Sequence, residues 1–220
     1  DGDYLSIQLD NTPDWLNVDI GEKYSLVFDG IDDRVEFPQI NLNSEFTIAT
    51  WVRVSADLEP FADIISVGTY GLSISAVTDH TVVSDHSGRD APYIKYQLNH
   101  LNSNVGWYEP IRAYIELDRW YHIAATYKNG IAKLYLSGVC AGSKSMPDVY
   151  LNAPILAGDR NFNSQYSYNL DGAIDELSIW GKELSETELN QLMYSSLHEG
   201  EDLLGYWSFD EGTGYIAYDQ

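Results

Sequence analysis

The stretch that decides the fold is GAIDELSIW, residues 172–180. It has the alternation of a buried β-strand, because successive side chains of a strand point to opposite faces of the sheet. One residue breaks the pattern, since the alternation puts Asp175 in the same row as Leu177 and Ile179. A carboxylate in an apolar row needs a hydrogen bond, an ion pair or a metal, because burying it bare is costly. Its partner has to come from an earlier part of the chain.

The charge of the chain is strongly unbalanced. Its 220 residues, enough for one large all-β domain or two small ones, include 12 Lys and Arg against 34 Asp and Glu, which gives a net charge of −22. Nucleic acid and acidic membrane surfaces are therefore disfavoured as partners, and cations are favoured. An acidic surface that only keeps a secreted protein soluble is the alternative.

The single cysteine, Cys140, excludes an internal disulfide. If the protein is extracellular, a bound metal is one way to replace the missing cross-links. No apolar run is long enough to span a membrane, so no membrane insertion is expected. The chain begins at Asp1 without a signal peptide, and we expect a mature protein or a domain excised from a longer one.

Short segments rich in β-branched and aromatic residues follow one another, separated by turn residues. Residues 46–54 and 120–127 predict central strands, and Asn129-Gly130 predicts a tight hairpin turn. A capping box that begins at Ser185 predicts one short helix, which ends near residue 195. The pattern as a whole predicts an all-β fold, a two-sheet antiparallel jelly-roll β-sandwich with one short C-terminal helix.

Five motifs, in this order, resemble those of the laminin G-like domains, a family of concanavalin A-like lectin and glucanase jelly rolls. They lie at residues 24–35, 46–52, 120–127, 134–138 and 172–188. The resemblance implies one laminin G-like domain over residues 1–198, with a core at about 24–194. Residues 199–220 contain LGYWSFDEGTG, which resembles the strand that normally opens such a domain. Here that strand either closes the same sandwich or opens a following segment.

Members of this family often hold a structural calcium ion between the early hairpin and the closing strand. The ligands that the resemblance implies are Asp29, the Gly30 carbonyl and Asp175, with Asp32, Asp33 and Glu176 as further candidates. Calcium takes roughly six to eight oxygen ligands from carboxylates and carbonyls, which a turn rich in Asp can offer. The alternative is that Asp29 and Asp175 only accept backbone hydrogen bonds or pair with Arg34.

Aromatic, amide and arginine side chains gather outside the predicted core, in loops and on one exposed face. The candidate ligand-binding residues are Tyr96, Trp107, Tyr108, Arg160, Asn161 and Tyr166, and Tyr93 and Tyr168 belong to the same clusters. Planar rings stack on the apolar faces of sugars, while amides and arginine supply directional hydrogen bonds. The same residue types dominate protein–protein contacts, and loop packing alone could also explain them.

No catalytic site is predicted. Glycoside hydrolases of related fold carry two closely spaced glutamates on one strand, whereas the glutamates here are scattered. We therefore expect a non-catalytic, calcium-stabilised extracellular module that binds carbohydrate or glycoprotein. Its setting would be a larger, multidomain adhesin or secreted protein, at the cell surface or released from it. The alternatives are a structural or protein-interaction spacer without glycan affinity and an enzyme of the glucanase or lyase type.

Overall fold

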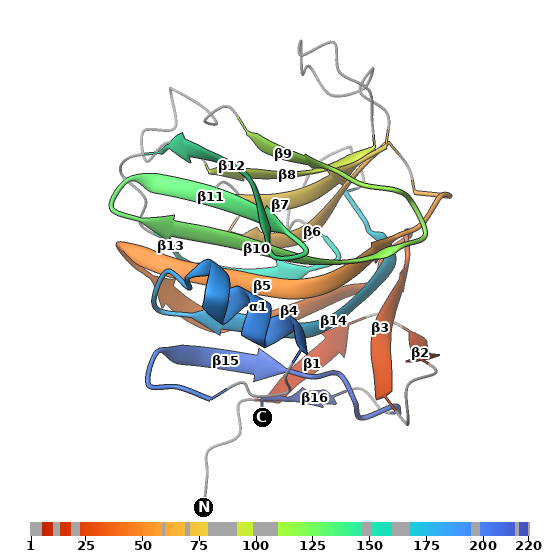
Figure 1. The fold of residues 1–220 in the computed structure, drawn as a ribbon. Helices are drawn as coiled ribbons and strands as arrows, with labels where there is room; N and C mark the ends of the chain where they lie inside the picture. The colour runs from red at the N-terminus through yellow and green to blue at the C-terminus, as the bar shows by residue number, and fades with distance from the viewer. Residues whose placement is uncertain are drawn as a thin grey trace, which may run out of the picture.

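The computed structural model describes residues 6–10, 14–18, 23–58, 60–68, 71–78, 92–98, 110–146, 151–159, 168–194, 199–213 and 216–219. These residues form two antiparallel sheets that pack face to face, with one helix (Figure 1). The predicted all-β sandwich with a short C-terminal helix is thus confirmed. No helix among these residues is long and apolar enough to cross a membrane.

The first sheet, called the β6 sheet below, contains eight strands. In spatial order they are β16 (Ile216–Tyr218), β1 (Ser6–Asp10), β4 (Arg34–Leu42), β13 (Leu151–Ala157), β6 (Phe61–Val67), β7 (Leu72–Val77), β8 (Tyr93–Leu98) and β9 (Ile111–Tyr114).

The second sheet is called the β5 sheet. In spatial order its strands are β12 (Val139–Ser145), β11 (Ile131–Leu136), β10 (Trp120–Lys128), β5 (Glu45–Val54), β14 (Asp171–Trp180), β3 (Lys23–Asp29) and β2 (Asp14–Val18), and β15 (Leu203–Trp207) pairs with β14. The predicted hairpin turn lies between β10 and β11, where Asn129 and Gly130 have φ angles of 48° and 82°. Positive φ at both positions is what a tight type I′ hairpin requires.

The apolar core lies between the two sheets, because alternate residues of each strand point inward. On β8, Ile94, Tyr96 and Leu98 face the core, which puts Tyr93 and Lys95 on the outer face. The C-terminal segment also contributes to this core: the Trp207 ring is buried and lies edge-on to Phe37, with ring centroids 4.7 Å apart. Residues 203–207 are therefore part of the sandwich.

Strand β14 departs from the alternation that its sequence implies. Its pairing with β5 shifts register between Asp175 and Ser178, and Glu176 has a φ of 52°. Because this bulge adds a residue, Ile174 and Leu177 both face the core, and the partly exposed Asp175 lies on the outer face. The prediction that Asp175 shares the apolar row of Leu177 and Ile179 is wrong for this reason.

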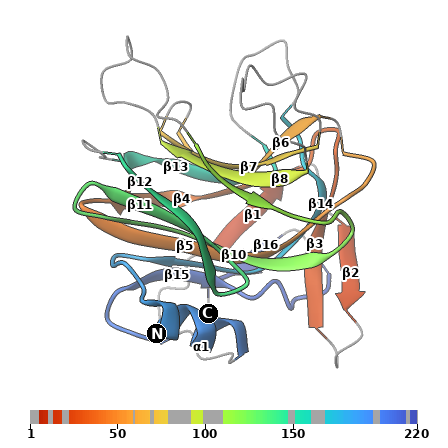
Figure 2. The same cartoon turned by 45° about the horizontal axis from the view of Figure 1, so that its top comes forward.

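Helix α1 (Glu186–Tyr194) covers part of the outer face of the β5 sheet (Figure 2). Its Leu189 and Leu192 pack against a second apolar cluster that includes Ala49 and Trp180. The predicted capping box is present. The Glu188 carboxylate accepts the Ser185 N–H at 2.7 Å, and the Ser185 hydroxyl accepts the Glu188 N–H at 3.3 Å. The hydrogen bond from the Ser185 backbone is the main reason that the pKa of Glu188 falls to about 2.

Candidate functional site

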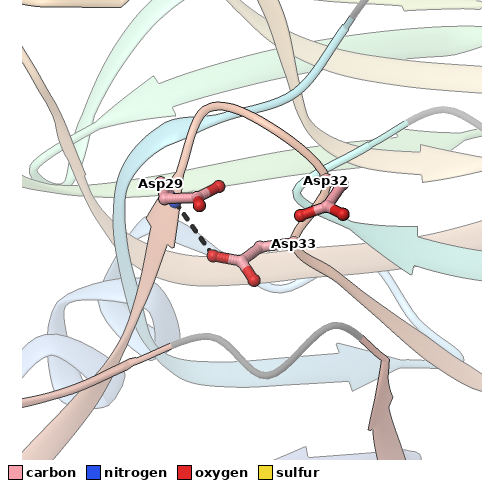
Figure 3. A group of neighbouring side chains, drawn as sticks. All are labelled: Asp29, Asp32 and Asp33. Atoms are coloured by element: carbon pink, nitrogen blue, oxygen red, sulfur yellow. Dashed lines mark hydrogen bonds between the residues drawn. The ribbon is translucent and has the colours of Figure 1, made fainter.

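Three carboxylates meet in the turn between β3 and β4. Ligand oxygens of Asp29, Asp32 and Asp33 lie within 4.8 Å of one another, and Asp33 is buried while the other two are exposed (Figure 3). The turn is held by its own hydrogen bonds: the Asp29 carboxylate accepts the Ile31 N–H at 2.8 Å, and the Asp33 carboxylate accepts the Asp29 N–H at 3.0 Å. Within the described part of the chain this is the one such acidic group.

Strand β14 brings Asp171, and not Asp175, to this turn. Asp171 is the register partner of Asp29, and the Gly30 N–H donates to the Leu170 carbonyl at 2.9 Å. Asp175 pairs with Trp51 of β5 instead. It lies four residues beyond Asp171, about 13 Å away at the usual rise of about 3.3 Å per residue. The predicted ligand set is therefore corrected. Asp29, Gly30, Asp32 and Asp33 lie together, whereas Asp175 and Glu176 lie elsewhere.

The donor set of the turn fits a hard cation. Carboxylate and carbonyl oxygens are the ligands that calcium prefers, and it tolerates the irregular geometry that a short turn imposes. Gly30 has a φ of 76°, a conformation that glycine adopts without strain and that lets the chain reverse between two acidic residues. Three carboxylates this close repel one another, and a bound cation would relieve that repulsion.

Asp175 and Glu176 have a different setting. They lie where β14 changes its neighbour, from β3 at residues 171–174 to β15 at residues 177–180. The Glu176 carboxylate accepts a hydrogen bond from the Tyr206 hydroxyl of β15. Burial, together with this bond to Glu176, raises the pKa of Tyr206 far above its usual value. The hydrogen bond from Tyr206 gives Glu176 a structural role at this strand junction.

A second polar feature covers the outer face of β6, β7, β8 and β9, and is called the polar face below. Its central cross-strand row is Asp63, Ser75, Lys95 and Arg112. The Asp63 side chain is fully buried and accepts hydrogen bonds from the hydroxyls of Ser73 at 2.8 Å and Ser75 at 2.6 Å. Lys95 is only 7% exposed. Asp63 and Lys95 are thus charged groups buried on the face that is turned away from the core.

Aromatic rings surround this row. The Lys95 ammonium lies 4.4 Å from the centre of the Phe61 ring, and the Arg112 guanidinium lies 5.8 Å from that of Tyr93. Phe61 is in turn edge-on to Tyr168, with ring centroids 5.3 Å apart. The polar face thus combines rings with carboxylate, hydroxyl, ammonium and guanidinium groups, the combination that orients a polar ligand.

The polar face also fixes both ends of the segment 160–167. The Ser66 hydroxyl donates to the Asp159 carbonyl at 3.1 Å, and the Asp63 N–H donates to the Tyr168 carbonyl at 2.9 Å. The predicted ligand residues Arg160, Asn161 and Tyr166 lie outside the described residues, as do Trp107 and Tyr108. Segment 160–167 joins β13 to β14, and segment 99–109 joins β8 to β9. Three of those four strands, β13, β8 and β9, belong to the β6 sheet.

The prediction that Tyr96 lies outside the core is wrong. Its ring is fully buried among the core residues, because Tyr96 is three positions from Tyr93 and so points to the opposite face of β8. Tyr93 and Tyr168, from the same predicted clusters, do lie at the polar face. Sequence reasoning missed Asp63, Lys95 and Arg112. Their signal is a polar residue at alternate positions of otherwise apolar strands.

Comparison with known proteins supports this fold. The family model of the concanavalin A-like lectin/glucanases superfamily matches residues 29–190. No curated protein matches the chain. Among solved structures, domain 4 of AbnA, a GH43 extracellular arabinanase from Geobacillus stearothermophilus in complex with arabinotriose, has a TM-score of 0.59 and 22% identity, over 83% of this chain and 82% of the other.

Two further structures have the same fold. A putative carbohydrate binding protein from Bacteroides ovatus has a TM-score of 0.63 and 15% identity, over 97% of this chain and 57% of that one. Botulinum neurotoxin type C, whose cell entry depends on two ganglioside molecules, has a TM-score of 0.60 and 18% identity, over 84% of this chain and 46% of the toxin chain. At such identities the likeness concerns the fold alone. The family model, which spans most of the chain, shows that the protein belongs to the concanavalin A-like lectin/glucanase superfamily.

Proposed function

We propose that this domain is a non-catalytic carbohydrate-binding module whose sugar site is the polar face of the β6 sheet together with segments 99–109 and 160–167, which adjoin strands of that sheet in the sequence. The observation that carries the proposal is the row of Asp63, Ser75, Lys95 and Arg112 on the outer side of a sheet, of which the first three are buried and Arg112 is partly exposed. Structural neighbours of this fold include a domain in complex with arabinotriose and a toxin that interacts with gangliosides.

The chemistry of the polar face suits a sugar. Pyranose and furanose rings offer an apolar face for stacking and hydroxyls for hydrogen bonds, and sites for such ligands combine rings with a few directional polar groups. Tyr114, 46% exposed and edge-on to Tyr93, provides an accessible ring at the edge of the row. Arg112, which is partly exposed, provides donors beside it.

We further propose that a calcium ion binds the acidic turn and stabilises the sandwich. Asp29, Asp32, Asp33 and the Gly30 carbonyl would hold it, and a hard cation there supplies charge neutralisation. The turn contacts the segment that leads to the polar face, because the Gly30 N–H bonds the Leu170 carbonyl and the Leu170 N–H bonds the Gly158 carbonyl. A cation that orders the turn would therefore also hold Leu170 and Gly158 in place, and these residues lie close in sequence to the two ends of the segment 160–167.

The module would work in a secreted or cell-surface protein, as one domain of a larger adhesin or polysaccharide-using protein. The acidic surface and the use of a cation rather than disulfides suit that setting. The AbnA neighbour is itself a domain of an extracellular arabinanase.

A glycan array followed by titration with the best glycan tests the sugar site. We expect Arg112→Gln and Tyr114→Ala on the polar face, and Trp107→Ala and Tyr166→Ala in the adjoining segments, to weaken binding about tenfold or more, since a stacked ring or charged hydrogen bond contributes on the order of 1.5 kcal/mol. Tyr194→Ala, at an exposed position of α1, is the matched control. Binding to no glycan, or equal loss with the control variant, contradicts the proposal.

A further inference from the structure

Arg53 lies on the outer face of the β5 sheet, the opposite side of the sandwich from the polar face. Its neighbours Val52 and Val54 point into the core, so its own side chain points outward. Across β10 its register partner is Trp120, and across β14 it is Ala173.

The guanidinium of Arg53 has no acidic partner in the described part of the chain. No ion pair or hydrogen bond of its side chain is found there, and its Nε is buried without an acceptor. Such isolation is unusual where 34 acidic residues face 12 basic ones. Other surface cations are paired: Arg119 with Glu116 at 3.2 Å, Lys128 with Glu45 at 2.9 Å and Lys133 with Glu183 at 2.8 Å.

Two half-buried tryptophans flank this arginine. Trp120 lies directly across from it, and Trp51 lies two residues earlier on the same strand and the same face. Trp51 is positioned by His122, edge-on to its ring with centroids 5.5 Å apart. Asp175, the register partner of Trp51, accepts the Glu176 N–H through its carboxylate at 2.9 Å.

We infer that Trp51, Arg53 and Trp120 form a second binding site, which takes a sugar that bears a carboxylate. The planar guanidinium matches a carboxylate and can bind it through two parallel hydrogen bonds. The tryptophan rings offer apolar surface for the sugar ring that carries the carboxylate. Because Arg53 has no acidic partner among the residues that the structure describes, its positive charge favours an anionic group at this point rather than a neutral one.

This site is separate from the proposed sugar site, so each can fail alone. The polar face belongs to the β6 sheet, whereas Trp51, Arg53 and Trp120 stand on β5 and β10 of the other sheet. A variant at Arg112 should leave the affinity for an acidic sugar at Arg53 unchanged. A variant at Arg53 should likewise leave the glycan of the polar face bound.

The test is calorimetric titration of the whole chain with a uronic acid trisaccharide and, as the matched neutral ligand, its methyl ester. Wild type should bind the acid at least tenfold more tightly than the ester, because the ester loses the ionic hydrogen bonds. Arg53→Gln and Arg53→Lys should each weaken binding of the acid about tenfold or more. Glutamine removes the positive charge, and lysine keeps the charge but lacks the two parallel N–H donors of the guanidinium. Arg119→Gln, which removes one exposed positive charge next to Trp120 in the sequence, should leave the affinity unchanged.

Several results would overturn the site: no binding of the acid by wild type, equal affinity for acid and ester, or full affinity in Arg53→Gln. If Arg112→Gln loses affinity for the uronic acid while Arg53→Gln keeps it, the acid binds at the polar face, and the site at Arg53 is overturned. A tetra-aspartate peptide that binds as tightly as the uronic acid would overturn the sugar as the occupant. The unfolding midpoint of Arg53→Lys, measured beside that of wild type, confirms that loss of binding is not loss of fold.

Discussion

Asp171 lies opposite Asp29 where β14 pairs with β3, and Asp175 lies beside Trp51 on another part of the sheet. The closing strand thus supplies an acidic neighbour to the β3–β4 turn, at a position four residues earlier than the sequence motif suggests. The bulge between Asp175 and Ser178 lies farther along the strand and leaves the pairing of Asp171 with Asp29 intact. The calcium proposal therefore places Asp171 next to the ion-binding turn and Asp175 away from it.

Calcium should stabilise the protein through the acidic turn. At a free concentration a hundredfold above its dissociation constant, a ligand specific to the folded state adds about 2.7 kcal/mol to the free energy of unfolding. We expect the unfolding midpoint to rise with calcium and to fall with chelator in wild type, and Asp32→Asn to reduce this difference. Asp175→Asn is the control and should keep it. The same midpoint with calcium and with chelator would exclude the ion.

Glu188 should make the stability of the protein depend on pH in acid. Its pKa is lowered from the ordinary value of 4.5 to about 2, mainly by the hydrogen bond from the Ser185 backbone. Because the folded-state pKa is depressed, the stabilisation is complete above pH 4.5 and is lost as the pH falls toward 2. Glu188→Gln should flatten this part of the pH profile of the unfolding free energy. Glu186→Gln, on the same helix turn but outside the capping box, should not.

The local signals in the sequence were reliable where one short segment decides the outcome. Asn129-Gly130 forms the predicted turn because both residues tolerate positive φ, and the capping box at Ser185 forms because its two partners are three residues apart. The acidic turn was predicted for the same reason, since Asp29, Asp32 and Asp33 are close in sequence.

The errors arose where strand pairing decides which way a side chain points. Glu176 adopts a φ of 52° although it is neither glycine nor asparagine, so nothing local marks the bulge that turns Asp175 outward. Composition alone groups Tyr96 with Tyr93 in one aromatic cluster. Successive side chains of a strand point to opposite faces, so these two residues, three positions apart, lie on different faces of β8. The row of Asp63, Lys95 and Arg112 comes from three strands and is visible only once their register is known.

Trp207 should be essential for the stability of the sandwich. Its ring is fully buried and packs against Phe37 of β4, so β15 contributes a side chain to the core between the two sheets. Truncating a buried tryptophan to alanine costs about 3–5 kcal/mol. We expect Trp207→Ala to lower the unfolding free energy by that amount in chemical denaturation. Leu204→Ala, at a position that is 36% exposed on the same strand, should cost far less. Similar losses in both variants would contradict this role of β15.

The bulge at Glu176 combines a strained backbone with a hydrogen bond, and the two terms can be separated. A left-handed conformation costs a residue other than glycine on the order of 1 kcal/mol, while the bond from the Tyr206 hydroxyl returns about 1 kcal/mol. Glu176→Gly removes both terms and should change the unfolding free energy little. In a Tyr206→Phe background the bond is already gone, so the same substitution should be more favourable by about 1 kcal/mol. A double-mutant cycle in urea measures this difference, and strict additivity would show that the Glu176 carboxylate does not hold the junction of β14 with β15.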